Sequence, residues 1–190
     1  MTDIKNQKLL YHLTSIKNIA NIIEHGLKPR NELSEFVDVA DSEILESRKS
    51  LSLEGYVPFH FFCKNPFDGR VQKDRPNEKF ALITVKREFA KNQNWQIIPC
   101  HPLANVAIEL LSYEKGVNEI NWELMETRDY GNPDCKSTCM AECLSPVTVE
   151  AKNFYAIYVC CSESKEIISE HKRNKILSFY LNETSEMFVR

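Results

Sequence analysis

The chain has 190 residues, 43% of them hydrophobic, and a formal net charge of −3 at pH 7. This length fits one domain with a single core, and the ordinary hydrophobic content excludes a disordered chain. The slightly acidic balance argues against a strongly basic nucleic-acid-binding protein, although it leaves room for a local basic surface.

The N-terminal segment lacks the long apolar run of a signal peptide, and no stretch approaches the roughly 18 apolar residues of a membrane span. Seven cysteines without a secretory signal are typical of reduced thiols, and their spacing lacks the paired C-x2-4-C pattern of zinc sites. We therefore expect one cytoplasmic domain over residues 1–190, with no metal and no membrane contact.

The first predicted element is a short strand at 11–14, where apolar and polar residues alternate. A helix over 16–25 follows, because apolar residues recur at helical spacing until Gly26 and Pro29. Residues 30–54 are polar and irregular, with one short helix around 42–48. The aromatic run "YVPFHFF" (56–62) predicts a strand that Pro58 either distorts or places at a sheet edge. Further strands are expected at 80–87 and around 96–100.

Apolar spacing predicts a helix over 103–113, and "INWELMETRDYGNPD" (120–134) predicts a short helix that runs into a turn. The last part of the chain predicts a core strand at 154–161, a helix near 163–174 and a strand near 176–182. Because strands and helices do not alternate regularly, we expect an α+β fold with a twisted, mostly antiparallel β core flanked by helices.

The common catalytic signatures are missing, since the sequence has no Gly-rich phosphate loop, nucleophile elbow or HExxH motif. Glu142 is the most unusual polar residue, because "CMAECLSP" (139–146) surrounds it with small, mostly apolar neighbours. Such a carboxylate either pairs with a cation that holds the fold or stabilises a cationic transition state. Other candidates beside apolar strands, each of which also has a purely structural explanation, are His12, Thr14, Arg48, Tyr56 and His101.

Five segments occur in an order that resembles the DarT family, NAD-dependent ADP-ribosyltransferases that modify bases of single-stranded DNA. They are "LLYHLTSIKNIANIIEHGLKPRN", "DSEILESR", "YVPFHFFCKNPF", "CHPLANVAIELLSYEKGVNEINWELMETR" and "KSTCMAECLSP", and they span about residues 9–160. The resemblance rests on all five in order, because no single segment is specific. It implies an ADP-ribosyltransferase-like fold and NAD as co-substrate. It also implies a thymine or guanine acceptor in single-stranded DNA and a macrodomain-type antitoxin as partner.

The resemblance implies a role for each candidate residue. Glu142 matches the catalytic glutamate, which would stabilise the positive charge that develops on the ribose. Arg48 matches the active-site arginine, and His101 matches a histidine that would help remove a proton from the base.

The remaining roles concern NAD and DNA. The residues expected at the cofactor are His12 and Thr14 at the nicotinamide end, Asn18 at the start of the next helix, Tyr56 stacked on the ring and Phe61 in the pocket wall. The residues expected at the nucleic acid lie on a basic, Pro- and Gly-containing loop expected over 64–79 and are Lys64, Arg70, Lys73 and Arg75.

The sequence also departs from the family pattern, since His60 replaces a usual tyrosine, Lys64 replaces a common arginine and "PCHPLA" replaces "DGHA". Two alternatives stay open. An ADP-ribosyltransferase acting on RNA or protein would keep the NAD site and change the substrate face. A catalytically silent nucleic-acid-binding module of the same fold would need neither Arg48 nor Glu142, so that the presence of both counts against it.

Overall fold

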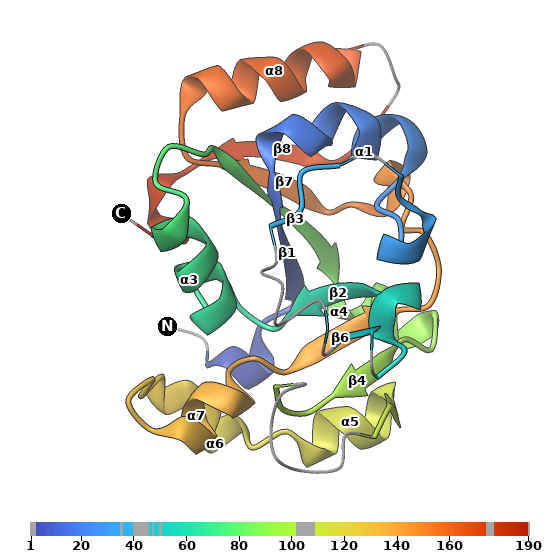
Figure 1. Ribbon diagram of the computed structural model, residues 1–190. Coiled ribbons are helices and arrows are strands. Elements are labelled where there is room, and N and C mark those ends of the chain that lie inside the picture. The colour runs from blue at the N-terminus through green and yellow to red at the C-terminus, as the bar shows by residue number, and fades with distance from the viewer. Residues whose placement is uncertain are drawn as a thin grey trace.

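The computed structural model describes residues 3–34, 36–39, 46, 48–49, 51–101, 109–173 and 177–189, and Figure 1 shows its elements. The strands are β1 (Leu9–Ser15), β2 (Val57–His60), β3 (Phe80–Lys86), β4 (Gln96–Ile98), β5 (Leu111–Ser112), β6 (Glu142–Ser145), β7 (Ala156–Val159) and β8 (Tyr180–Glu183). The helices are α1 (Ile19–His25), α3 (Pro66–Asp74), α4 (Arg87–Asn92), α5 (Tyr113–Glu119), α6 (Trp122–Thr127), α7 (Pro133–Thr138) and α8 (Ser162–Arg173). Short 3₁₀ helices lie at Ile4–Asn6, Ile16–Asn18, Arg30–Glu32, Leu53–Gly55, Ala151–Asn153 and Ser185–Met187.

All eight strands form one sheet in the order β5-β4-β6-β2-β1-β3-β7-β8. Neighbouring strands are antiparallel except for the parallel pair β7 and β8. In Figure 1, α1 and α8 lie along the top of the molecule, α3 lies at the left, and α5, α6 and α7 lie along the bottom. The predicted α+β class with a mostly antiparallel core is therefore confirmed.

Between β1 and β2 the sheet opens. β1 pairs with β3 through all of its residues from Leu9 to Ser15, but it pairs with β2 only at Tyr11 and His60. The strands diverge on one side of this pair, as Figure 1 shows. The divergence leaves room for a cleft between two halves of one continuous sheet.

Pro58 lies inside β2 at this opening, opposite Leu144 of β6. Proline has no N–H to donate, so it is tolerated in a sheet only where the ladder is interrupted or absent. The carbonyl oxygen of Pro58 bonds the His12 side chain at 2.8 Å instead of a strand backbone. The strand is thus distorted rather than placed at an edge, which is one of the two outcomes expected from its proline.

The strand β3 is buried on both faces, because its alternating residues enter two different apolar clusters. Ala81, Ile83 and Val85 belong to the main core, whereas Phe80 and Leu82 belong to a second cluster beneath α3. Both strand faces are therefore covered, which explains why the sequence of β3 is a continuous apolar run rather than an alternation.

Two predicted helices lie partly or largely outside the residues that the structure describes. The expected helix at 42–48 lies largely outside the described residues, and so do 102–108 of the expected helix over 103–113. The C-terminal end of the second prediction is wrong, because Leu111 and Ser112 form β5 against β4 and the helix starts only at Tyr113. Backbone pairing at the end of the sheet overrides the local helical spacing there.

Candidate active site

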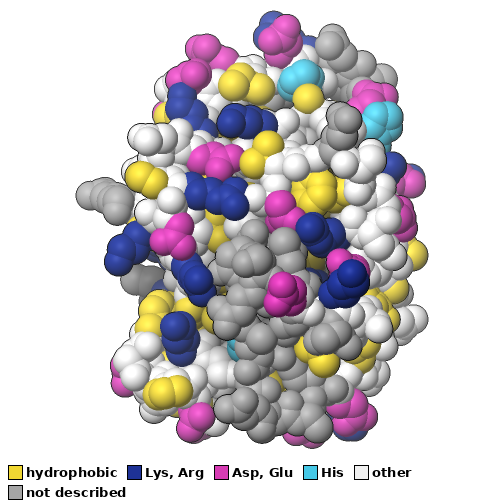
Figure 2. Space-filling view, viewed as in Figure 1, with side chains coloured by type: hydrophobic (Ala, Val, Ile, Leu, Met, Phe, Trp, Pro, Cys, Tyr) yellow, Lys and Arg dark blue, Asp and Glu magenta, His cyan; other side chains and the backbone are white. Residues whose placement is uncertain are grey.

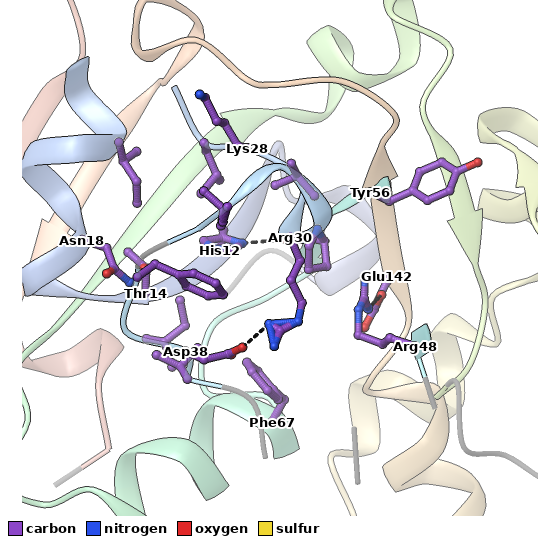
Figure 3. Close-up of a pocket in the computed structure, with 18 of the residues that line it drawn as sticks. His12, Thr14, Asn18, Lys28, Arg30, Asp38, Arg48, Tyr56, Phe67 and Glu142 are labelled. Carbon is purple, nitrogen blue, oxygen red and sulfur yellow. Dashed lines mark hydrogen bonds and ion pairs between the residues drawn. The ribbon is translucent and has the colours of Figure 1, made fainter. Parts of the chain in front are cut away.

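A cleft opens where β1 and β2 diverge, and it holds about 1210 Å³ of space, open solvent at its mouth included. Its walls come from β1, α1, the segment that follows α1, β2 and the start of β6. Figure 3 shows the lining side chains converging on this space from several elements. The sequence candidates that line it are His12, Thr14, Asn18, Arg48, Tyr56, His101 and Glu142.

An ion pair between Arg48 and Glu142 stands at one side of the cleft (Figure 3). The guanidinium Nη1 lies 2.5 Å from the carboxylate Oε2, and each residue is 7% exposed. Arg48 Nη2 also donates to the carbonyl oxygen of Leu53 at 3.4 Å. Such a buried pair needs close geometry and further hydrogen bonds to offset desolvation of both charges. The carboxylate is therefore held in one position at the cleft wall.

Glu142 reaches this wall because it is the first residue of β6. In the antiparallel register it lies opposite His60 of β2 on one side and Ile98 of β4 on the other. Its neighbours Ala141 and Cys143 are buried in the main core. Alternation along β6 thus sends the small side chains into the core and the carboxylate toward the cleft.

Asn18 organises the opposite wall. Its amide nitrogen donates to Thr14 Oγ1 at 3.2 Å and to the carbonyl oxygen of Val37 at 2.9 Å, and its amide oxygen accepts from the Val37 N–H at 2.9 Å. This two-way bond to the backbone of Val37 fastens residues 36–39 against β1. Asn18 therefore shapes the cleft as well as lining it.

Charged side chains that the sequence reasoning missed lie on this wall. Arg30 forms an ion pair with Asp38 and lies over the ring of Phe36, with its guanidinium carbon 5.4 Å from the ring centroid. Lys28 lines the same cavity (Figure 3). These residues come from an irregular polar segment, so no periodic pattern could have revealed them.

His60 is also missing from the sequence prediction of site residues, whereas Phe61 was included. The structure places His60 in the cleft wall, 6% exposed, and Phe61 in the main core, where its ring meets Trp122 edge-on at 5.3 Å. Phe61 does not line the cleft. Alternation in a strand puts adjacent side chains on opposite faces, and this signal could have selected His60 over Phe61.

Burial sets the protonation of two histidines in the cleft. It lowers the pKa of His12 to about 4, against an opposing hydrogen bond to Pro58. Burial also lowers the pKa of His60, against the opposing charge of Glu142 and a bond to the Ala141 carbonyl. Both rings are therefore neutral near pH 7 and can accept a proton through one nitrogen.

Tyr56 and His101 lie nearer the outside. Figure 3 shows the Tyr56 ring directed away from His12 and toward the outer side of the cavity. His101 is half-buried, and its backbone N–H donates to the carbonyl oxygen of Ser137 at 3.0 Å. Both residues line the cleft and are half-buried.

The basic candidates do not line the cleft itself. Lys64 and the exposed Arg70 and Lys73 lie at or on α3, which replaces the loop expected over most of 64–79. Figure 2 shows Lys and Arg side chains gathered over α3 at the left of the molecule. Arg75 instead binds the backbone of Asp38, because its Nη1 donates to the Asp38 carbonyl oxygen at 2.6 Å.

Across the described parts of the chain, no group of three or more histidine, cysteine, aspartate or glutamate side chains is placed to hold a metal ion. Within the same residues, no helix is long and apolar enough to cross a membrane.

Comparisons with known proteins identify the family and the fold. The model of the family described as "ssDNA thymidine ADP-ribosyltransferase, DarT" matches residues 11–188. A search of curated proteins gave no match. Among solved structures, DarT of Thermus sp. 2.9 with ADP-ribosylated single-stranded DNA is similar at a TM-score of 0.81 and 15% identity, over 96% of both chains.

Two further solved structures are similar. DarT of Thermus sp. 2.9 in complex with NAD⁺ gives a TM-score of 0.78 at 12% identity, over 97% of this chain and 98% of that one. DarTG of Thermosipho africanus in complex with ADP-ribose gives 0.70 at 23% identity, over 96% of this chain and 51% of that one. At these identities the structural likeness establishes the fold.

Proposed function

The chain belongs to the DarT family of single-stranded DNA thymidine ADP-ribosyltransferases, and we propose that the cleft between β1 and β2 is where it transfers ADP-ribose from NAD to thymidine. The ion pair of Arg48 and Glu142 carries this proposal, because it places a fixed carboxylate at the wall of a cleft lined by apolar and a few converging polar groups.

The chemistry explains why a carboxylate belongs there. Breaking the bond between nicotinamide and ribose gives the ribose oxocarbenium character, with positive charge near C1′. A carboxylate already held in position stabilises that charge without having to reorganise during the reaction. Arg48 holds the Glu142 carboxylate, and the cavity wall limits the access of water to it.

NAD is the donor, and side chains that line the cleft suit two parts of it. His12 and Thr14 would hold the nicotinamide end beside β1. Lys28 and Arg30, which line the same cavity, would face the pyrophosphate, because cationic side chains favour anionic groups. The Thermus DarT structure solved with NAD⁺ supports this use of the fold.

Single-stranded DNA would approach across α3. Lys64 and Lys73 supply positive charge for phosphates, and Phe67 of the same helix lines the cleft, where a base can stack on its ring. Chain-wide negative charge does not oppose this arrangement, because Lys64 and Lys73 lie together at α3. The Thermus DarT structure solved with ADP-ribosylated single-stranded DNA supports this acceptor.

A macrodomain-type antitoxin that removes ADP-ribose from DNA would be the natural partner. The solved DarTG of Thermosipho africanus supports this expectation, because that chain was solved with ADP-ribose and about half of it, 51%, matches this one.

Measuring the release of nicotinamide shows which class of molecule accepts ADP-ribose. The protein would be incubated with NAD and, in turn, single-stranded DNA, single-stranded RNA of the same sequence, or a protein extract. We expect nicotinamide release to depend on the DNA. Release that depends on RNA or protein instead would establish the first alternative, and DNA binding without any NAD cleavage would establish a silent module.

A further inference from the structure

The cleft presents an unprotonated imidazole nitrogen directly beside the Arg48–Glu142 pair. The ring is that of His60, whose Cα pairs with that of Glu142 across β2 and β6. Side chains directly opposite each other in an antiparallel pair lie on one face of the sheet, with Cβ atoms roughly 5 Å apart. His60 and Glu142 therefore face the same reacting centre.

The hydrogen bonds of His60 fix its tautomer. Its Nδ1 lies 3.2 Å from the carbonyl oxygen of Ala141. A carbonyl oxygen only accepts, so Nδ1 carries the proton and Nε2 of the neutral ring keeps a free lone pair. Nothing in the described part of the chain hydrogen-bonds Nε2, and this atom is not sealed from the cavity.

The ring is also held in orientation. It packs on Phe67 at a centroid distance of 5.6 Å and an interplanar angle of 33°. The charged and titratable groups that act on it are Glu142 of β6, Arg48 and His12 of β1. Because Glu142 is engaged by Arg48, the nitrogen of His60 is the better placed acceptor for a proton.

The acceptor base needs such a group. Thymine in DNA is joined to its sugar through N1, so N3 is its one ring N–H, and N3 is a poor nucleophile until that proton leaves. We propose that His60 accepts the N3 proton of the target thymine through Nε2. This inference rests on the proposed function and adds a second acid–base group to the carboxylate of Glu142.

The step is balanced as follows. The N3–H electron pair forms the N3–C1′ bond, and the C1′–nicotinamide electron pair leaves with neutral nicotinamide. The proton moves to His60 Nε2 and is then released to solvent. One NAD⁺ and one thymidine thus give ADP-ribosyl-thymidine, nicotinamide and one proton.

His60→Gln tests the proposal, because glutamine can still donate to the Ala141 carbonyl but offers no basic nitrogen. We expect the rate of DNA modification to fall about 100-fold or more, the size of a general-base contribution. The KM for NAD and the slow cleavage of NAD by water should remain, because neither involves the thymine proton. His171→Gln on α8 is the matched control and should behave as the native protein.

Two readouts separate a proton acceptor from a structural residue. The native transfer rate should fall only as the pH drops through the pKa of His60, which burial places below the ordinary histidine value of 6.5, and this acid limb should vanish in His60→Gln. An oligonucleotide carrying 5-fluorouracil, whose N3–H is more acidic, should restore much of the activity of His60→Gln and little of that of Glu142→Gln.

Three outcomes would overturn the proposal while leaving the proposed function intact. The first is an unchanged transfer rate in His60→Gln. The second is an equal loss, in His60→Gln, of transfer to DNA and of NAD cleavage by water. The third is a loss of transfer without a loss of NAD cleavage in His101→Gln instead of His60→Gln. Failure of the native protein to modify DNA would instead remove the proposed function itself.

Discussion

Glu142 raised the question of whether a carboxylate among small apolar residues holds the fold or serves a reaction. The structure gives it both properties, since it is paired with Arg48 at 2.5 Å and also lines the cleft. The two properties support each other, because a carboxylate that must face a transient cation has to be kept in position between reactions. Sequence alone presented the two as alternatives, since it could not place Arg48 beside a residue so distant in the chain.

His12 should make the free energy of unfolding depend on pH. Its folded pKa of about 4 lies below the ordinary value of 6.5. The unfolded chain therefore binds more protons between these values, so that the contribution of neutral His12 is complete above pH 6.5 and is lost as the pH falls toward 4. Because the ring is partly exposed, we expect this contribution to be about 1–3 kcal/mol.

Urea unfolding at pH 7 and pH 4.5 measures this effect. The native protein should lose more unfolding free energy between the two values than His12→Gln does. Equal losses in the two proteins would show that His12 does not carry the acid dependence.

The buried side chains of Asn65 and Asp68 cap the N-terminus of α3. Asn65 Oδ1 accepts from the Asp68 N–H at 3.0 Å, and Asp68 Oδ2 accepts from the Lys64 N–H at 3.0 Å. These two bonds cap the N-terminus of α3 directly after Lys64, which has a positive φ of 58°. They fix the start of the helix that carries the basic side chains. Burial raises the pKa of Asp68 to about 7, against the hydrogen bonds from Lys64 and Asn65.

Asp68→Asn should therefore stabilise the protein more at alkaline than at acidic pH. The folded pKa is raised, so that the contribution of protonated Asp68 is complete below the unfolded pKa of 3.8 and is lost as the pH rises through about 7. Asparagine keeps the acceptor for Lys64 without the charge. At pH 8.5 we expect a gain of about 2–4 kcal/mol over the native protein, and at pH 5 a much smaller one. A variant that is equally stable relative to the native protein at both pH values would contradict this account of the cap.

Gly116 sets how closely α5 packs on β4. A Cβ at this position would lie 2.4 Å from the Cβ of Ile97 and 2.7 Å from its Cγ2. Gly116→Ala should therefore destabilise the protein by about 1–3 kcal/mol through overpacking, although alanine is the better helix former. Gly69→Ala on α3 is the matched control, because nothing lies within 4 Å of its added Cβ. Thermal unfolding of both variants measures the difference, and equal stability would refute the packing argument.

The elements differ in how much of them could be predicted. The helix over 16–25 and the strand over 80–87 follow from local periodicity, and the structure has η2 with α1 and β3 there. The divergence of β1 from β2 could not be predicted, because it depends on strand pairing between distant segments, although Pro58 hinted at it. Likewise Arg30 and Asp38 enter the site only because Asn18 fastens their segment to β1. The sequence candidates that line the cleft are His12, Thr14, Asn18, Arg48, Tyr56, His101 and Glu142, whereas Phe61 lies in the main core because it is one residue of strand alternation away from His60.

For the whole molecule, the distribution of charge matters more than its sum. The net charge of −3 coexists with basic side chains over α3 (Figure 2). If these contact phosphates, DNA binding should weaken with salt, with a slope of about 0.7 for each contact to a single strand.

Lys73→Gln should reduce this slope by about 0.7 and weaken binding regardless of DNA sequence. Lys91→Gln on α4 makes the same change in charge away from the cleft and should leave the slope unchanged. Fluorescence anisotropy of a labelled oligonucleotide over a range of salt concentrations measures both. Equal slopes for the two variants would place the DNA elsewhere on the surface.

The most direct test of the account is the intact mass of a single-stranded oligonucleotide after incubation with the protein and NAD. An oligonucleotide containing one thymidine should gain the mass of one ADP-ribose, and a matched oligonucleotide without thymidine should gain none. Glu142→Gln should reduce the yield by on the order of 1000-fold, as loss of transition-state charge stabilisation does. An adduct that forms without thymidine, or one that forms equally fast with Glu142→Gln, would contradict the roles assigned to the base and to the carboxylate.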